Sequence, residues 1–117
     1  MGLDQFAYIR KNKTDKVDAK FIWRKHAKLQ KFMEDLWYSK NKEEFNCKDL
    51  ELTEDMVKYL KLLITHNKME ESEGGFFYGH QFQDEQEDHY KEQDLEFCEW
   101  AIKNIRDGKT VCYSCWY

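Results

Sequence analysis

The sequence has no proline, only 5 glycines and no long apolar run. A membrane-spanning helix needs roughly 20 consecutive apolar residues, so none is expected. Internal repeats, Gly/Ser linkers and low-complexity tracts are also missing, and the first residues do not follow the basic-then-apolar order of a signal peptide. These absences predict one domain over residues 1–117 of a soluble, intracellular, cytoplasmic protein with no membrane partner.

Several motifs that define enzyme families are absent as well. Gly74 and Gly75 are not followed by the Gly-Lys-Ser/Thr of a phosphate-binding loop, and no Gly-x-Gly-x-x-Gly or Gly-x-Ser-x-Gly motif is present. The 23 acidic residues make some carboxylate pair inevitable, so no acid–base pair can be selected. We predict no cofactor and name no catalytic residue; the sequence favours a non-enzymatic protein without excluding an enzyme.

Bulky apolar material, in contrast, is abundant. The 117 residues are 41% hydrophobic and 16% aromatic, with 4 Trp, 7 Tyr and 8 Phe. A chain of this length buries roughly two-thirds of its unfolded surface, which is enough for a core without disulfides or a structural metal. Disorder of the whole chain is therefore not expected.

Hydrophobic periodicity predicts about three helices and two terminal strands. We expect strands at 5–10 and 110–117, helices at 17–38, 53–66 and 90–107, and loops at 39–52 and 81–89. Thr53 is the expected N-cap of the second helix, and Gly108 the left-handed end of the third. The predicted fold is α+β: the helices pack on a small antiparallel pairing of the N- and C-terminal strands, with 76–78 at a core edge.

Charge is unevenly distributed along this chain of net charge −4. Segment 10–31 is basic and segment 70–99 is acidic. The two blocks can be solvated faces that attract each other within the fold or within a homodimer. The alternative is a nucleic-acid footprint in the basic block, but the acidic block and a pI near 5.6 would repel a polyanion. A nucleic-acid partner is therefore not expected.

One group of residues could bind a ligand. Its members are Trp23, Arg24, Lys25, His26, Phe76, Phe77 and Tyr78. Consecutive positions on a helix diverge by roughly 100°, so residues 23–26 cannot all line one pocket. Either Trp23 and His26 pack in the core while Arg24 makes a surface ion pair, or a cation beside 76–78 binds an anionic group through charge and stacking.

A second group could bind a divalent cation. Its members are His80, Asp84, Asp88 and His89, with Glu85 between them. Their oxygen and nitrogen atoms suit such an ion, but no glycine supports a calcium-loop turn inside the segment. An exposed acidic loop explains the same residues.

The 4 cysteines lie at positions 47, 98, 112 and 115. Nothing indicates secretion, so reduced thiols are expected. Cys112 and Cys115 have the spacing of a zinc knuckle or a redox motif. On a regular strand, however, their side chains point to opposite faces, which disfavours a shared site.

Four separated motifs carry a family resemblance. They are the MGLD start at 1–4, the WRKH run at 23–26, the GFFYG segment at 75–79 and the YSCW ending at 113–116. Together they resemble a family of small phage and phage-like proteins, in which the ending is more often YYSSW. The resemblance implies a soluble phage-type accessory protein, in the host cell cytoplasm if phage-encoded. It implies no catalytic residue.

The hypothesis from sequence is a non-enzymatic accessory protein that binds a host or phage protein through a charge-polarised surface. The alternative is a protein, enzymes included, that binds a small anionic ligand or a divalent metal.

Overall fold

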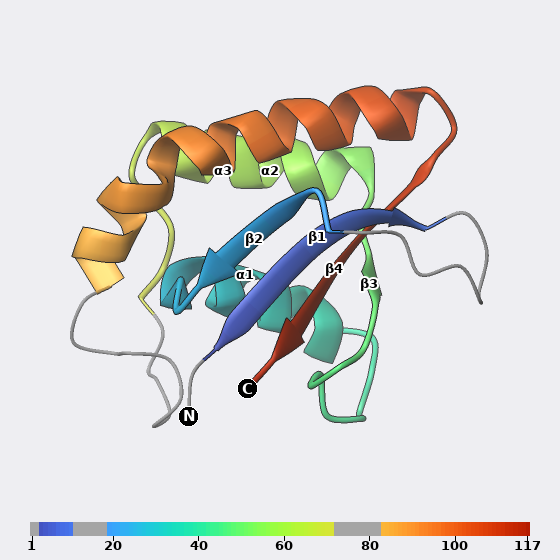
Figure 1. Ribbon diagram of the computed structural model, residues 1–117, viewed down its shortest axis with the longest axis horizontal. Helices are drawn as coiled ribbons and strands as arrows, with labels where there is room; N and C mark the ends of the chain where they lie inside the picture. Colours follow the sequence, from blue (N-terminus) through green and yellow to red (C-terminus); the bar gives the residue numbers. More distant parts are fainter. Residues whose placement is uncertain (1–2, 11–18, 72–82) are drawn as a thin grey trace.

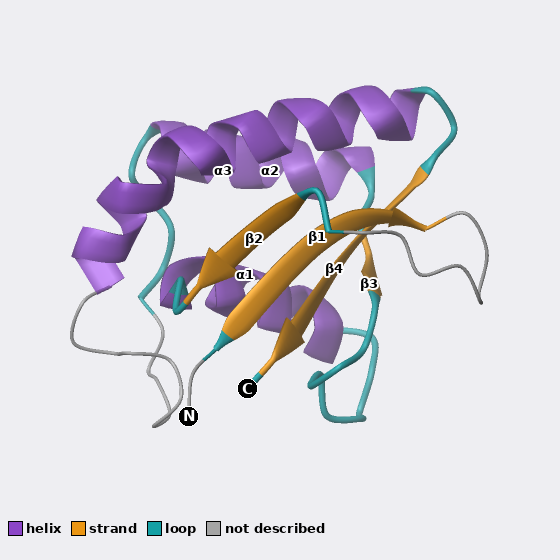
Figure 2. Ribbon diagram, viewed as in Figure 1, coloured by secondary structure: helices purple, strands orange, loops and turns teal. Residues whose placement is uncertain are grey.

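The protein consists of an antiparallel sheet and a layer of helices (Figures 1 and 2). The computed structural model describes residues 3–10, 19–71 and 83–117. Along the chain the described elements are β1 (Asp4–Arg10), β2 (Phe21–Arg24), α1 (Ala27–Tyr38), β3 (Leu50–Glu51), α2 (Glu54–Thr65), α3 (Gln83–Arg106) and β4 (Thr110–Trp116). This is the small α+β fold that the sequence predicts.

The sheet has the strand order β2-β1-β4-β3, and every neighbouring pair is antiparallel. The two terminal strands pair along their whole length, from Asp4 opposite Trp116 to Arg10 opposite Thr110. The predicted pairing of N- and C-terminal strands is thus confirmed. It lies at the centre of the sheet, flanked by the short strands β2 and β3.

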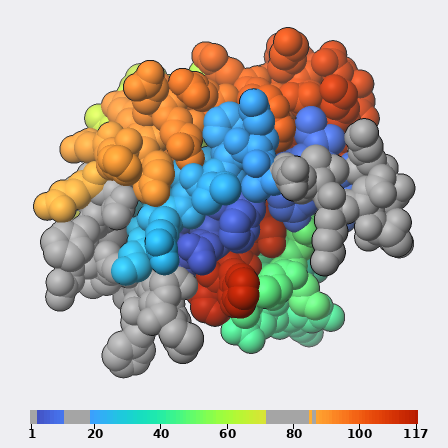
Figure 3. Space-filling model, in the orientation of Figure 1, coloured from blue at the N-terminus to red at the C-terminus, as the bar shows by residue number. Residues whose placement is uncertain are grey.

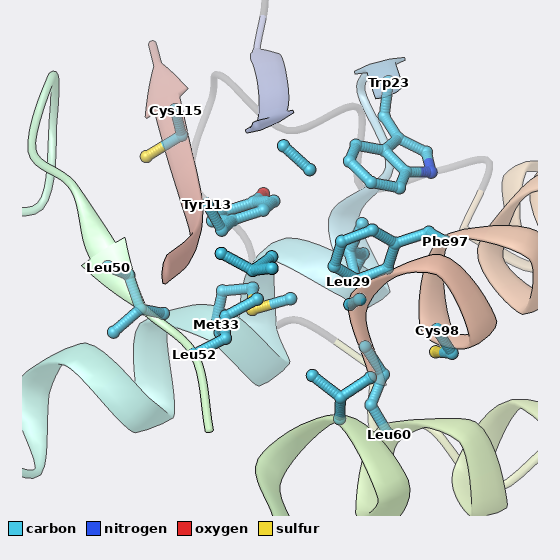
Figure 4. Packing of buried hydrophobic residues seen from close by; sticks show 14 of the residues in the cluster. Trp23, Leu29, Met33, Leu50, Leu52, Leu60, Phe97, Cys98, Tyr113 and Cys115 are labelled. Atoms are coloured by element: carbon cyan, nitrogen blue, oxygen red, sulfur yellow. The ribbon is translucent and has the colours of Figure 1, made fainter. Parts of the chain in front are cut away.

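All three helices cover the same face of the sheet, as Figure 1 shows. Between them lies one hydrophobic core, to which every helix contributes. In Figure 4, Trp23 of β2 and Tyr113 of β4 point toward Leu29 and Met33 of α1 and Phe97 of α3. The opposite face of the sheet therefore has no helix of the described chain packed on it.

The prediction of one helix over 17–38 is wrong in its first part. Residues Phe21–Arg24 form β2, and α1 begins only at Ala27. Lys25, between them, has a left-handed backbone with φ 57°, which ends the strand. The aromatic and β-branched residues of 21–24 alternate between the two faces of the sheet, a period of two rather than 3.6.

The predicted loop at 81–89 is wrong as well, because α3 begins at Gln83. The acidic composition that indicates an exposed loop also suits a helix, because glutamate and glutamine favour helices. Glu87, Tyr90 and Asp94, spaced three and four residues apart, share a face of α3. Their contacts with β2 and α1, described below, hold this part of α3 against the core.

Two predicted helix ends are confirmed. The backbone N–H of Met56 donates to the side chain of Thr53, which is the N-cap of α2. After α3, Gly108 has φ 84° and its N–H donates to the carbonyl of Ile105. Over the residues that the structure describes, no helix is both long and apolar enough to span a membrane.

Candidate functional site

The face of the sheet that points away from the described helices carries alternate residues of β1, β2 and β4. Successive side chains on a strand point to opposite faces, so the residues that alternate with the buried ones along each strand face outward. The outward positions are Asp4, Phe6, Tyr8 and Arg10 on β1, Ile22 and Arg24 on β2, and Cys112, Ser114 and Trp116 on β4. In Figure 3 these strands form the centre of the face in view.

Three apolar side chains lie together on this face: Ile22, Phe6 and Trp116, which we call the sheet-face patch. Phe6 is directly opposite Ile22 in the ladder, and Trp116 is opposite Asp4, two residues from Phe6. Ile22 is 58% exposed and Trp116 is 63% exposed. Ile22 is thus the direct neighbour of Phe6 on this face and Trp116 its diagonal neighbour, and both positions are within reach of large side chains.

Three cations lie in or directly beside β2, the strand that carries Ile22. Lys20, Arg24 and Lys25 are all exposed. Arg24 lies opposite Asp4 in the ladder, and its Nε is 3.5 Å from Asp4 Oδ1. Exposed ion pairs of this kind contribute little to stability, so both groups can be redirected to a partner.

Polar side chains cover the far end of the same face. The Tyr8 hydroxyl donates to the Asp49 carboxylate. Arg10 Nη1 lies 3.6 Å from Asp49 Oδ2, and Arg10 Nη2 lies 3.4 Å from Glu51 Oε2. Beneath them Cys112 is completely buried, and burial raises the pKa of its thiol to about 11. The exposed apolar surface is therefore limited to the half of the sheet that carries Ile22, Phe6 and Trp116.

Side chains of α3 close the free edge of β2. Gln93 Nε2 donates to the carbonyl of Ile22 at 2.8 Å, and the Tyr90 hydroxyl accepts from the N–H of Arg24 at 3.0 Å. These are the backbone groups of β2 that point away from β1. An open strand edge can recruit further strands, and at this edge the side chains of α3 occupy the two backbone groups.

Asp94 of α3 anchors β2 from the core side. It is fully buried and accepts from Trp23 Nε1 and from His26 Nε2, both at 2.7 Å. The ring of Tyr90 stacks on His26 at a centroid distance of 5.3 Å. Because the Asp94 carboxylate accepts, His26 donates from Nε2, and its Nδ1 has no hydrogen-bond partner among the described residues.

A second buried chain of hydrogen bonds joins both long strands to α1. Gln5 Nε2 donates to the Tyr113 hydroxyl at 2.8 Å, which donates to Gln30 Oε1 at 2.6 Å. Gln5 also binds the backbone of His26, accepting from its N–H at 2.9 Å and donating to its carbonyl at 3.1 Å. These bonds fix the junction between β2 and α1, and with it the position of Ile22.

The structure describes four of the predicted ligand residues, and it buries two of them and exposes the other two. Trp23 and His26 are fully buried and Arg24 makes the ion pair with Asp4, so our first interpretation of residues 23–26 is confirmed. Arg24 and Lys25 instead line a shallow hollow of about 480 Å³ together with Glu85, His89 and Tyr90. Phe76, Phe77 and Tyr78 lie outside the described residues, so their place beside the cations stays a prediction.

The predicted metal ligands are only partly described. His80 lies outside the described residues, and of Asp84 only its place in α3 is given. Asp88 and His89 are exposed neighbours on α3. Within 3–10, 19–71 and 83–117, no three His, Cys, Asp or Glu side chains gather to hold a metal ion.

The two charge blocks of the sequence meet inside the fold. Lys28 Nζ lies 3.2 Å from Glu87 Oε1, and both side chains are largely buried. Lys31 Nζ lies 3.8 Å from Glu70 Oε2. The interpretation that the basic and acidic blocks attract each other within the fold is confirmed at these two contacts.

A second apolar surface lies on the helix layer. Tyr59 and Leu62 of α2 are 58% and 55% exposed. Tyr59 borders a groove of about 300 Å³ between α1 and α2, whose apolar lining includes Phe32, Leu36 and Leu63. The residues of this surface come from helices and the following turn, and the sheet-face patch is on the opposite side of the sheet.

Sequence reasoning missed the sheet-face patch. The helix predicted over 17–38 includes Ile22, and the strand predicted over 110–117 includes Trp116, but neither prediction places a side chain on a face of a sheet. The signal that could have found the patch is the alternation of 21–24, where Phe21 and Trp23 occupy one face and Ile22 and Arg24 the other.

Comparison of the chain with protein-family models, curated proteins and solved structures gives no match.

Proposed function

We propose that this protein is a non-enzymatic accessory protein that binds another protein through the sheet-face patch. The observation that carries the proposal is the exposure of Ile22 and Trp116 beside Phe6 on the sheet face that no described helix covers. Apolar side chains exposed near one another in water favour association, and tryptophan is enriched among the residues that dominate interface energies.

The charges around the patch define the chemistry of the partner. Arg24 lies on the same face and the exposed Lys20 and Lys25 flank β2 in the sequence, so a complementary protein surface presents an apolar side chain flanked by carboxylates. Rim charges of this kind mainly raise the association rate and select the partner. The resemblance to small phage proteins supports a host or phage protein as that partner.

The test is affinity purification with three forms of the chain. Ile22→Glu places a carboxylate in the sheet-face patch, and Leu62→Glu is the matched control, because Leu62 is exposed to a similar degree on the helix layer. We expect the wild type and Leu62→Glu to retain a protein that Ile22→Glu loses. If Ile22→Glu retains the same proteins as the wild type, the patch is not the binding surface.

Self-association is a separate outcome of the same test. If the captured protein is a second copy of the chain, the protein forms a homodimer. The opposite charges of the basic and acidic blocks allow such a dimer. Sedimentation velocity then shows a dimer for the wild type and for Leu62→Glu, and a monomer for Ile22→Glu. A monomer in all three forms removes the homodimer from consideration.

A second candidate function is binding of a small anion in the shallow hollow. Arg24 and Lys25 supply two cations there, and the Tyr90 side chain lines the same hollow. Native mass spectrometry of untagged protein purified without chelator tests this: a stoichiometric extra mass that Arg24→Ala loses supports it. A clean mass, with no shift on adding phosphate, contradicts it and leaves the protein-binding proposal intact.

A further inference from the structure

Cys47 and Cys115 are brought together by a backbone hydrogen bond. Cys47 lies in the segment between α1 and β3, and its N–H donates to the carbonyl of Cys115 in β4 at 2.8 Å. With standard peptide bond lengths, this bond limits the distance between the two Cα atoms to about 6.7 Å. Disulfides join Cα atoms about 4.4–6.8 Å apart, so the two backbones are already within bonding range.

The side chain of Cys115 points toward the segment that carries Cys47. Its Sγ is 3.9 Å from the carbonyl oxygen of Phe45 and 3.3 Å from Gln30 Nε2. Figure 4 shows the sulfur directed to the side of β4 on which β3 lies. A further bond, from Tyr117 N–H to Asn46 Oδ1 at 3.0 Å, holds the same two segments together. For the two sulfurs to meet, the weak contacts of Cys115 Sγ with Phe45 and Gln30 must break, as must that of Cys47 Sγ with Asn46 Oδ1 at 3.8 Å.

The two thiols differ in access. Cys47 is exposed and has a left-handed backbone with φ 61°, whereas Cys115 is 1% exposed. Burial raises the pKa of the Cys115 thiol to about 12, although the hydrogen bond from Gln30 opposes this. A disulfide reagent in solution therefore reacts at Cys47 first, and Cys115 follows within the protein.

We infer that Cys47 and Cys115 are a disulfide site, which a small-molecule disulfide such as oxidised glutathione closes reversibly. The Cys47 thiolate attacks one glutathione sulfur and releases the other as glutathione thiolate. Cys115 then gives its proton to water, and its sulfur attacks Cys47 Sγ, which releases the second glutathione. Two protein thiols are oxidised and one glutathione disulfide is reduced to two thiols.

The bond would tie the segment before β3 to the end of β4. The next residue is Trp116 of the sheet-face patch, so the disulfide fixes the strand that presents this side chain. Formation of the bond does not depend on any partner, so the inference stands or fails independently of the proposed function.

The experiment is oxidation of the full, reduced chain with oxidised glutathione, followed by intact-mass measurement and peptide mapping without reductant. We expect a loss of about 2 Da and a peptide pair joining Cys47 to Cys115. Cys112→Ser changes the same strand on its other face and should not affect the bond. Cys47→Ser, an exposed change, should abolish it, and Cys115→Ser should keep a glutathione adduct of about 305 Da on Cys47.

Two results would overturn the inference. One is a wild-type protein that accumulates the glutathione adduct on Cys47 while Cys115 stays reduced. The other is a dimer joined through Cys47 of two copies. Because both are read on the wild type, the conclusion does not rest on whether Cys115→Ser folds.

Discussion

Trp23 and Trp116 represent the two faces of one sheet. Trp23 has no exposed surface, and its indole N–H is bound by Asp94, whereas Trp116 is 63% exposed on the opposite face. On the core face even the polar side chains Gln5 and Tyr113 are buried and hydrogen-bonded to each other. On the other face, apolar side chains remain in water. The comparison indicates that one face stabilises the fold, whereas the other leaves Ile22 and Trp116 exposed among the described residues, as the proposed binding surface requires.

Substitutions at neighbouring positions should separate these two roles. Trp23→Ala should lower the free energy of unfolding by about 3–5 kcal/mol, because it leaves a large cavity in the core. Ile22→Ala, one residue away on the exposed face, should change it by at most about 0.5 kcal/mol. Urea unfolding of both variants measures the difference. Equal losses of unfolding free energy in the two variants would show that both faces of the sheet contribute equally to stability.

Asp94 should be nearly as important as Trp23. Asp94→Ala leaves Trp23 Nε1 and His26 Nε2 without their buried acceptor, and should cost about 3 kcal/mol. Glu96→Ala, an exposed change on the same helix, is the control and should cost at most about 0.5 kcal/mol. Chemical denaturation of the pair checks this, and a cost for Asp94→Ala no larger than that of the control would contradict the anchoring role.

Removing one tyrosine hydroxyl from each face of the sheet should lower the free energy of unfolding by smaller amounts. Tyr113→Phe removes the hydroxyl between Gln5 and Gln30, which should cost about 1–2 kcal/mol, because buried groups lose their partners. Tyr8→Phe removes a hydroxyl bound to Asp49 on the other face, and should cost less than about 1 kcal/mol. Thermal and urea unfolding should rank the two in this order. The reverse order would mean that the outer face also stabilises the fold.

The smallest effect is expected in the helix layer, away from both faces. Hydrogen bonds from Lys58 and from Arg106 lower the pKa of Glu54 below its usual value of 4.5. Since the folded state binds this proton less tightly, the contribution to stability is present above pH 4.5 and is lost as pH falls through the folded pKa. Glu54→Gln should therefore be slightly less stable than the wild type near neutral pH, and the difference should vanish in acid. A difference that persists in acid would contradict the ion-pair origin.

The sequence predicted the parts of the fold that local patterns determine. The N-cap at Thr53, the turn at Gly108 and the terminal strands each have a local signal, and each is confirmed. The sequence does not predict the start of α3 at Gln83. The first turns of this helix are stabilised by contacts of Glu87 with Lys28 and of Tyr90 with His26, and these partners are roughly 60 residues away in sequence.

The sheet-face patch could not be predicted from the sequence for a similar reason. Ile22 matches a helical stripe with Leu29 and Met33 when only spacing is considered. Its exposure depends on the pairing of Phe6 with Ile22 and on all helices packing on the other face. Both features depend on tertiary contacts with distant parts of the chain, so the residue spacing within 17–38 cannot predict them.

The measurement that tests the central claim most directly is site-specific photo-cross-linking. A photoreactive phenylalanine analogue is placed at position 22 in one chain and at position 62 in another, positions that are exposed to a similar degree on opposite sides of the sheet. We predict that position 22 cross-links to a partner protein and that position 62 does not. Cross-linking from position 62 alone, or equally from both, would contradict the assignment of binding to the sheet-face patch.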